Sequence, residues 1–401
     1  MFGRLQAEAA QLGKPEWRPV LLYLAQLHAR GTKPAGGPFA RPWEEIGPGY
    51  CGRPAFGHWD IVHQILDVLP REPEHARNQI LNNLQNQEPD GLIPGVIWLR
   101  KPAGEWSREV GHPPVWPVAV ADFVKQYQDR DLLATCYAAL RRQIGWFEST
   151  RRAEGEGFFY TDILNHSWES GVDDGVRFDR ISPGRFACID ATAHVFWLYR
   201  FAAAWAEELG EAAPRFQAAA AELQTFLQRR CFDEETGFFH DIWAVGHPEQ
   251  RHLAYEGMWP MVVGAATAAQ AARVIDENLL AASRFFAKHP ITTVAKSDPL
   301  FELRMWRGPA WNSMTYWAAR GCVQAGRRDA ARQLLEAALD GSAEQYAATG
   351  TIWEFYHPDG GAPHGLQRKP YTDRNLPCED YLGHNPLFAM TRMWEEVEPV
   401  T

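Results

Sequence analysis

Two similar stretches decide the fold of this 401-residue chain: residues 151–163 read RRAEGEGFFYTDI, and residues 229–242 read RRCFDEETGFFHDI. Each follows segments with helical periodicity, and their central glycines, Gly157 and Gly237, lie 80 positions apart. Helical pairs that end in the same turn and then recur are typical of a solenoid or of a closed ring of helix pairs. Because the spacing is irregular and the loops are long, the ring is favoured.

Most of the remaining chain also carries apolar residues at helical spacing. The predicted helices cover 19–30, 62–69, 75–87, 118–128, 131–151, 190–208, 212–230, 268–280, 311–325, 328–339 and 381–395. Apolar runs such as Leu92-Ile93-Pro94 contain Pro or Gly, which favours loops over strands. No linker rich in Gly, Ser or Pro divides the chain. We therefore predict an all-α fold, an (α/α)6 barrel with long loops over one mouth, formed by residues 1–401 as a single domain.

The composition narrows the class of partner. A net charge of −10 argues against nucleic acid and against an anionic membrane surface, since both are bound by clustered Lys and Arg. Residues 1–12 lack a signal-peptide pattern, and no apolar stretch is long enough to span a bilayer. Six scattered cysteines show no Cys-x-x-Cys spacing, which predicts no metal, no cofactor and a reducing, cytoplasmic location.

An acidic loop with two large aromatic residues is the strongest sign of a functional site. Residues 168–179 read WESGVDDGVRFD, and they place four carboxylates and one arginine beside Trp168 and Phe178. A partly dry aromatic environment keeps a carboxylic acid protonated, as an acid that cleaves a sugar must be. An N-cap and turn would account for the loop equally well. The 17 tryptophans suit sugar rings, although most of them are expected to fill the core.

Two further segments combine aromatic residues with a charged group. Residues 351–360 read TIWEFYHPDG and set Glu354 between Trp353 and Phe355. Taken alone, Glu354 is better interpreted as a solvent-facing glutamate at a helix end. Residues 305–312 read MWRGPAWN, where Arg307 could donate a fork of hydrogen bonds to a sugar, or the Gly-Pro bend could simply begin a helix.

Together these segments resemble a known family. FGHWD (56–60), GHPPVW (111–116), WESGVD (168–173), WRGPAW (306–311) and WEFYHPDGG (353–361) are similar, in the same order, to motifs of the trehalase-like and glucosidase I-like inverting glycosidases. The compact length most resembles the bacterial mannosylglycerate and glucosylglycerate hydrolases of glycoside hydrolase family 63. The resemblance implies an inverting α-glycosidase that hydrolyses a small α-linked glycoside, most directly α-mannosylglycerate or α-glucosylglycerate, with no cofactor. A homo-oligomer is possible.

The resemblance also implies residue roles. Asp173 matches the general acid and Glu354 the general base, with the adjacent Asp174 as the main competitor for the acid role. The residues implied to contact substrate are Trp59, Asp60, His112, Trp168, Gly171, Arg177, Trp306, Arg307 and Trp311. An inverting pair should stand roughly 6.5–9.5 Å apart, which leaves room for the attacking water.

The chain departs from the family pattern where the leaving group should bind. His112 replaces a glutamine, Met305 replaces an aromatic residue, and residues 369–386 read KPYTDRNLPCEDYLGHNP. A carboxylate-bearing leaving group would need a cationic subsite. The candidate cations are Arg177, Arg185, Lys369 and Arg374, although each taken singly is better interpreted as a surface charge.

Three other functions stay open. One is an α-glucosidase that acts on a disaccharide or oligosaccharide, like a trehalase or kojibiase. A second is a sugar 2-epimerase on the same barrel, which would use histidines such as His58, His112 or His240 as acid and base. A third is a non-catalytic sugar-binding barrel. The paired carboxylate motifs favour a glycosidase, because neither the epimerase nor the binding protein requires them.

Overall fold

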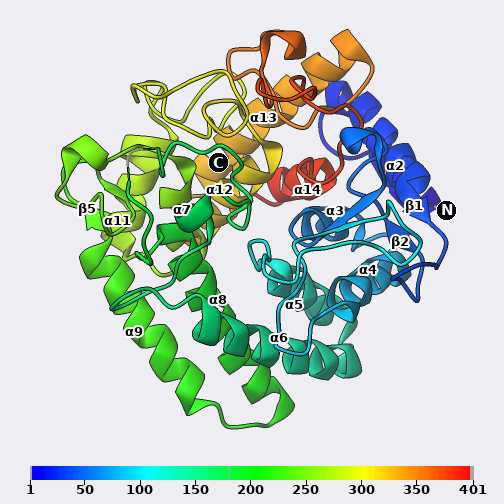
Figure 1. The fold of residues 1–401 in the computed structure, drawn as a ribbon. Helices are drawn as coiled ribbons and strands as arrows, with labels where there is room; N and C mark the ends of the chain where they lie inside the picture. The colour runs from blue at the N-terminus through cyan, green and yellow to red at the C-terminus, as the bar shows by residue number, and fades with distance from the viewer. Residues whose placement is uncertain (1, 180, 398–401) are drawn as a thin grey trace.

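The computed structural model describes residues 2–179 and 181–397, and its helices form two concentric rings (Figure 1). The inner ring consists of α3 (Asp60–Val68), α5 (Trp116–Tyr127), α8 (Ile189–Leu209), α10 (Trp259–Val262), α12 (Asn312–Gln324) and α14 (Leu387–Glu396). The outer ring consists of α2 (Arg18–Gly31), α4 (Pro73–Gln85), α6 (Arg130–Thr150), α9 (Pro214–Arg230), α11 (Ala268–Arg273) with the π-helical η5 (Val274–Leu279), and α13 (Arg328–Thr349). Helix α14 packs against α3 and closes the ring. The predicted (α/α)6 barrel is confirmed.

The remaining elements are short. The helices among them are α1 (Gly3–Ala9), α7 (Asp162–Asn165), and the 3-10 turns η1 (Pro15–Trp17), η2 (Tyr50–Gly52), η3 (Pro248–Gln250), η4 (Tyr255–Met258) and η6 (Pro363–Gly365). Six strands pair as antiparallel two-stranded ribbons: β1 (Thr32–Lys33) with β2 (Trp43–Glu44), β3 (Ala55–Gly57) with β4 (Val96–Trp98), and β5 (Phe232–Asp233) with β6 (Phe238–Phe239).

Local sequence sets where the long helices begin and end. Proline stands in the first helical turn of α2, α4, α5 and α9, where its missing N–H costs no hydrogen bond. The Asp129 carboxylate caps α6 by accepting a hydrogen bond from the Leu132 N–H at 2.9 Å. Gly210 and Gly350 end α8 and α13 in the left-handed conformation.

The predicted helices are present, with three differences in extent. The segment 268–280 changes from α- to π-helix at Val274, and the helix predicted over 328–339 continues to Thr349. The helix predicted over 381–395 begins only at Leu387. Pro386 stands at its N-cap, and the residues before it form a loop that reaches the barrel mouth. Apolar spacing alone does not distinguish such a loop from a helix.

The two repeated stretches take the same local structure. Each follows an outer helix and turns back on itself, through an Arg152–Phe158 bridge after α6 and through the β5–β6 ribbon after α9. The turns place Gly157 at φ +87° and Gly237 at φ +64°, which favours glycine at both positions.

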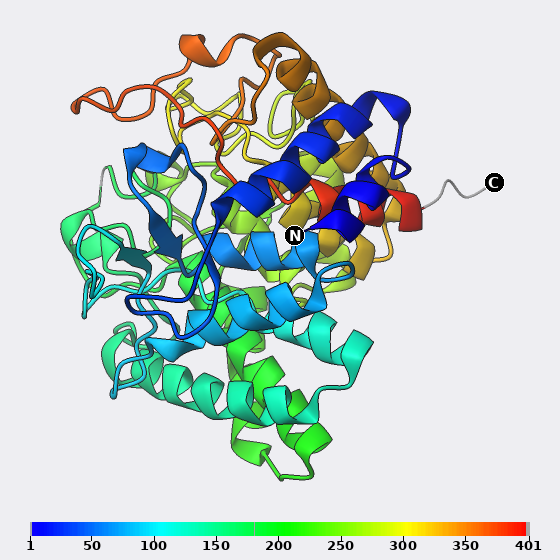
Figure 2. The same cartoon turned by 90° about the vertical axis from the view of Figure 1, so that its right-hand side faces the viewer.

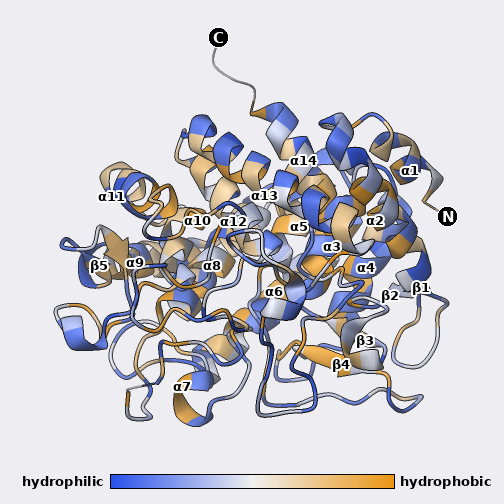
Figure 3. Ribbon diagram, turned by 90° about the horizontal axis from the view of Figure 1, so that it is seen from above, coloured by the Kyte–Doolittle hydropathy of each residue, from blue (hydrophilic) through white to orange (hydrophobic). Residues whose placement is uncertain are grey.

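The long loops gather at one end of the barrel. Figures 2 and 3 show β3 and β4 among these loops, with the end of α14 toward the opposite end of the barrel. Between them, apolar side chains from α1 to α14 form one continuous buried cluster, in which the helices of both rings take part. Among the described residues, no helix is long and apolar enough to cross a membrane.

Candidate active site

A cavity of about 250 Å³ lies at the loop end of the barrel. It is lined by Tyr50, Trp59, Asp60, Val96, Trp98, His112, Trp168, Gly171, Asp173, Met305, Trp306, Trp311, Glu354, Arg368, Lys369, Tyr381 and His384. These lining residues come from segments that are far apart in the chain, from Tyr50 near the N-terminus to His384 near the C-terminus. Of the eleven residues predicted to form the site, nine line this cavity.

Three stacked tryptophans form one wall. The Trp306 ring lies between Trp59 and Trp311, with centroid separations of 5.9 Å and 3.7 Å and nearly parallel planes. Gly171 packs against the face of Trp59, where a Cβ atom would come within 2.0 Å of the ring. The indole N–H of Trp59 is buried and has no hydrogen-bond partner within the described chain. The wall therefore offers apolar ring faces together with a free donor, which matches the C–H faces and hydroxyl edges of a sugar.

Asp60 lies at the start of α3 and is almost fully buried. Burial raises the pKa of its carboxyl to about 6. The Tyr381 hydroxyl donates a hydrogen bond to Asp60 Oδ1 at 2.8 Å. A Cβ atom at Gly57 or Gly383 would come within 2.3 Å of an Asp60 carboxylate oxygen, so both neighbours must lack a side chain. Asp60 is thus fixed in one orientation beside the tryptophan wall.

Glu354 is held by an arginine that lies fourteen residues later in the chain. Arg368 donates to Glu354 Oε2 through Nε at 2.6 Å and to Oε1 through Nη2 at 2.9 Å. The Cys378 N–H donates to Oε2 at 3.1 Å. Within the described chain Oε1 therefore accepts one hydrogen bond and Oε2 accepts two. The paired carboxylate is only 2% exposed, yet Oε1 keeps a lone pair for a further donor.

The Asp173 side chain is more exposed to solvent than the Glu354 side chain. Its side chain is 25% exposed, and the Lys369 ammonium contacts Asp173 Oδ2 at 2.6 Å. The adjacent Asp174 does not line the cavity. Its backbone takes the left-handed conformation at φ +61°, and its carboxylate lies 3.3 Å from Arg304 Nε. Of the two neighbouring aspartates, only Asp173 reaches the cavity.

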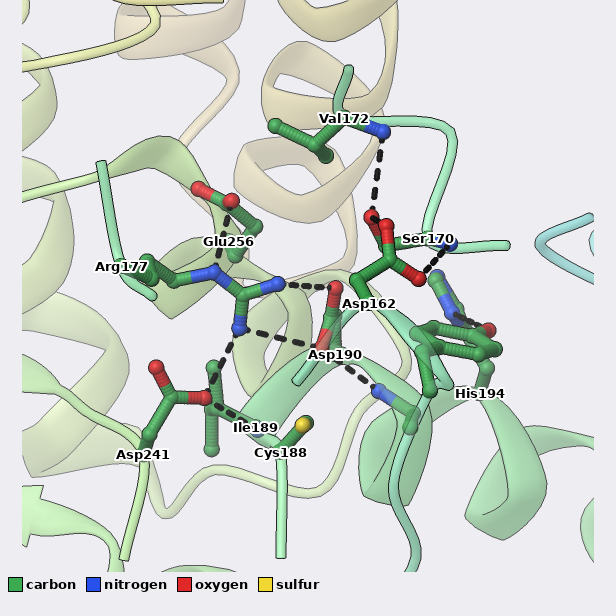
Figure 4. A network of polar contacts seen from close by, with 12 residues as sticks. Asp162, Ser170, Val172, Arg177, Cys188, Ile189, Asp190, His194, Asp241 and Glu256 are labelled. Carbon is green, nitrogen blue, oxygen red and sulfur yellow. Dashed lines mark hydrogen bonds and ion pairs between the residues drawn. The ribbon is translucent and has the colours of Figure 1, made fainter. Parts of the chain in front are cut away.

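Arg177 lies outside the cavity, in a buried network that Figure 4 shows. Its guanidinium contacts Asp190 at 2.7 Å, Asp241 at 2.8 Å and Glu256 at 2.8 Å. These carboxylates belong to α8, to the segment after β6 and to η4. Although Cys188, Asp190 and Asp241 have the spacing of a metal site, the cation between the two aspartates is Arg177. Each of its three guanidinium nitrogens contacts a carboxylate of this network, and Arg177 does not line the cavity, so its contact with substrate stays a prediction.

Arg307 also anchors the acidic loop and does not line the cavity. Its Nε donates to the Asp174 carbonyl at 2.9 Å, and its Nη2 donates to Asp179 Oδ1 at 2.8 Å. At the start of the same loop, Arg151 forms a two-pronged ion pair with Glu169. The predicted contact between Arg307 and substrate is therefore replaced by a contact between Arg307 and the loop that carries Asp173.

The histidines near the barrel axis are neutral. Burial lowers the pKa of His112 to about 3 and that of His58 to about 4, and it lowers the pKa of His384 well below its usual value. His240 hydrogen-bonds to Thr236 and does not line the cavity. An epimerase that uses a histidine pair needs one protonated imidazole at neutral pH. None of these four residues meets that requirement.

The sequence did not identify several residues of the lining, among them Arg368, Tyr381 and His384. All three fall in or beside the 369–386 stretch that departs from the family pattern, and that departure was the available signal. Of the four candidate cations for the leaving group, only Lys369 lines the cavity.

Comparison with known proteins shows the family of the chain. Residues 53–372 match the family model of the Mannosylglycerate hydrolase MGH1-like glycoside hydrolase domain. The chain belongs to this glycoside hydrolase family. It is therefore an enzyme, and its glycosidase class is confirmed.

One relative and two solved structures are similar to the chain. It is 20% identical, over 77% of its own length and 86% of the other, to a mannosylglycerate hydrolase of Rubrobacter radiotolerans. The crystal structure of the GH63 mannosylglycerate hydrolase of Thermus thermophilus with glucose shares its fold, with a TM-score of 0.69, 19% identity and coverage of 93% of this chain and 99% of that one. The neutral trehalase of Saccharomyces cerevisiae also shares the fold, with a TM-score of 0.65, 14% identity and coverage of 90% and 74%.

Proposed function

We propose that this glycoside hydrolase cleaves the α-glycosidic bond of a hexosylglycerate, α-mannosylglycerate or α-glucosylglycerate, with inversion at the anomeric carbon. The observation that carries the proposal is the pair of carboxylates in one tryptophan-walled cavity. Glu354 is buried and held by Arg368, whereas Asp173 is partly exposed and paired with Lys369. Two carboxylates in different environments suit two different roles.

Glu354 is the proposed general base. The Arg368 guanidinium compensates the charge of the buried carboxylate, and such a carboxylate suits a group that takes a proton from water. Its less occupied oxygen, Oε1, would accept a hydrogen bond from the attacking water. The water would add to the anomeric carbon as its proton passes to Glu354.

Asp173 is the proposed general acid, which gives its proton to the glycosidic oxygen as the bond to the anomeric carbon breaks. That oxygen joins the sugar to the leaving group, so a residue that contacts Asp173 lies close to the leaving group. Lys369 is such a residue, at 2.6 Å. A glycerate carboxylate would take Lys369 as its partner and would release Asp173 from its ion pair. This exchange of partners favours an anionic leaving group.

A panel of substrates tests the proposal. We expect the purified protein to release glycerate from α-mannosylglycerate or α-glucosylglycerate with a kcat/KM at least tenfold above that for trehalose, kojibiose and nigerose. A preference for one of the disaccharides would support the trehalase-like or kojibiase-like alternative instead. Free mannose, glucose and N-acetylglucosamine test for an isomerase, and conversion of any of them would contradict the proposal.

The proposed setting of the enzyme is the cytoplasm, with a small-molecule sugar as its partner. All six cysteines are free, and free thiols persist in a reducing compartment. A homo-oligomer stays a prediction, which the molar mass in solution would test.

A further inference from the structure

The six cysteines divide into two groups by exposure. Four are buried in the barrel, namely Cys136, Cys188, Cys231 and Cys322. The two that are partly exposed, Cys51 and Cys378, are 327 positions apart in the chain, and yet the Cys378 thiol is near enough to be the main influence on the pKa of the Cys51 thiol. Neighbouring thiols that reach solvent differ from the small buried residues that scattered cysteines usually are.

Backbone contacts hold this thiol pair together. Cys51 belongs to the turn η2, where it takes the left-handed conformation at φ +51°. The chain before this turn presses on the segment after Cys378, since a Cβ atom at Gly49 would come within 1.9 Å of the Glu379 carbonyl oxygen. The neighbouring Tyr50 and Cys378 pack on the same small apolar cluster. The segments that carry Cys51 and Cys378 are therefore packed side by side.

The pair also adjoins the proposed catalytic base. Cys378 clasps Glu354 through its backbone: its N–H donates to Glu354 Oε2 at 3.1 Å, and its carbonyl accepts from the Glu354 N–H at 2.8 Å. A movement of Cys378 therefore reaches Glu354 directly.

The environment favours a reactive thiolate at Cys51. The hydrogen bond from the Cys378 thiol, assisted by the positive charge of Arg368, lowers the pKa of the Cys51 thiol to about 6. The same hydrogen bond raises the pKa of the Cys378 thiol. An accessible thiolate beside a second thiol is the arrangement that oxidants of the peroxide class attack.

We propose that Cys51 and Cys378 form a redox modification site, which a peroxide converts to a disulfide that reversibly slows the glycosidase. The two sulfur atoms must approach to about 2.05 Å to form the bond. Closing that gap pulls Cys378, and its N–H, away from the position in which it binds Glu354. The part of the proposal that concerns activity rests on the proposed function of Glu354.

The chemistry balances in two steps. The Cys51 thiolate attacks a peroxide oxygen, the O–O bond breaks, and a sulfenic acid and one water form after uptake of a proton. The Cys378 sulfur then attacks the sulfenic sulfur, the S–O bond breaks, and hydroxide leaves as a second water with the thiol proton. Two thiols lose two electrons in total, and hydrogen peroxide takes up both. A dithiol reductant reverses the reaction by thiol–disulfide exchange.

Peptide mapping without reductant tests the modification itself. The full chain is treated with one to five equivalents of hydrogen peroxide, digested and analysed by mass spectrometry. We expect a peptide that joins Cys51 to Cys378 and that disappears after dithiothreitol. The variant Cys51→Ser should give no such peptide, and the buried control Cys322→Ser should behave as the wild type. Absence of the cross-link in the wild type would overturn the proposal, whatever the substrate.

Two further readouts test the coupling to Glu354. Turnover of the best substrate should fall at least fivefold on oxidation, recover with dithiothreitol, and stay constant in oxidised Cys51→Ser. Amide hydrogen exchange needs no substrate, and it should become faster in residues 352–356 and 376–380 of the oxidised wild type. A cross-linked protein with unchanged exchange in both segments would overturn the coupling. That result is distinguishable from failure of the proposed function, which would show as no turnover before oxidation.

Discussion

Asp173 and Glu354 face one cavity from different local environments, and the partner of each determines what that carboxylate can do. Lys369 contacts Asp173 through a single ammonium, whereas Arg368 holds Glu354 through two parallel hydrogen bonds. A lysine contact is easily exchanged, but a two-pronged arginine pair is not. We therefore expect the ion pair of Asp173 to open when a ligand binds and Glu354 to keep its arginine partner.

Substitution of each carboxylate should have a distinct signature. On α-mannosylglycerate, Asp173→Asn and Glu354→Gln should each lower kcat by a factor of about 10²–10⁴, the usual contribution of a general acid or base. On a 4-nitrophenyl α-glycoside, whose leaving group needs no proton, Asp173→Asn should lose much less activity, and Glu354→Gln should lose as much as before. Steady-state kinetics on both substrates measure the difference. Asp174→Asn is the matched control, and a loss in Asp174→Asn as large as in Asp173→Asn would contradict the assignment.

Lys369 should determine the preference for an anionic leaving group. Lys369→Met keeps most of the side-chain length and removes the charge. We expect kcat/KM for the glycerate glycoside to fall about 10- to 100-fold, the worth of one charged hydrogen bond. The value for the corresponding glycerol glycoside, which has no carboxylate, should change at most a few-fold. Equal losses on the two substrates would show that Lys369 does not bind the leaving group.

At the residue scale, the sequence predicted cavity-lining residues best where several of them belong to one short motif. Trp306 and Trp311 come from a single segment, and so do Trp168, Gly171 and Asp173, and all five line the cavity. Arg177 and Arg307 lie in the same motifs but point away, because buried carboxylates distant in sequence pair with them. The direction in which a charged side chain points from a loop depends on such distant partners. A single sequence does not show which residues those partners are.

At the scale of elements, the loop 168–179 is held by arginines at both ends. Glu169 pairs with Arg151 before Asp173, the proposed general acid, and Arg177 pairs with three carboxylates after it. Burial raises the pKa of Asp241 to about 6 and that of Glu256 to about 7, so the network holds less negative charge near neutral pH than its three carboxyl groups suggest. The loop that carries Asp173 is fixed by charge more than by its own hydrogen bonds.

Loss of the Arg177 cation should loosen this loop. Arg177→Met leaves buried carboxylates without their partner, and we expect the free energy of unfolding to fall by about 3–5 kcal/mol. Arg177→Lys keeps the charge but cannot reach three partners at once, so a smaller loss is expected. In the lysine variant, amide exchange should rise in residues 168–179 before the rest of the barrel. Equilibrium denaturation and exchange mass spectrometry measure the two effects, and unchanged exchange in this loop would contradict an anchoring role.

The helices were predictable as elements because most carry apolar residues at helical spacing, and several have a proline in the first turn. The segment 381–386 was wrongly included in a helix, since Tyr381 and Leu382 continue the apolar spacing of α14. Those apolar side chains face the cavity and its surroundings instead. Long-range packing thus overrides periodicity where the chain forms part of the site.

At the scale of the whole molecule, a buried ionic network joins the first helices of the ring. His28 in α2 contacts Glu44 in β2 at 2.6 Å and lies 3.5 Å from Asp67 in α3, and His75 in α4 contacts Glu44 at 2.8 Å. Burial by itself lowers the pKa of His28, but Glu44 and Asp67 outweigh it and raise that pKa to about 9. The protonated form of His28 therefore stabilises the fold.

This network predicts how stability depends on pH. Because the pKa of His28 rises from 6.5 in the unfolded chain to about 9 in the folded one, the stabilisation is full below pH 6.5 and is lost as the pH rises through 9. The size is roughly 3 kcal/mol, from 1.36 kcal/mol for each pKa unit. Urea denaturation between pH 6 and pH 10 should show this loss in the wild type and in the exposed control His247→Gln. The loss should be absent in His28→Gln, and an equal slope in that variant would exclude His28 as its source.

The inverting pair is the central claim, and the configuration of the first product tests it most directly. Proton NMR can follow the anomeric signals while the purified enzyme hydrolyses the α-linked substrate that the panel identifies, with Glu354→Gln as the control. We predict that the β-anomer of the free hexose appears first, that the α-anomer follows only by mutarotation, and that the control releases neither at a comparable rate. Initial release of the α-anomer, or undiminished release by Glu354→Gln, would contradict the account.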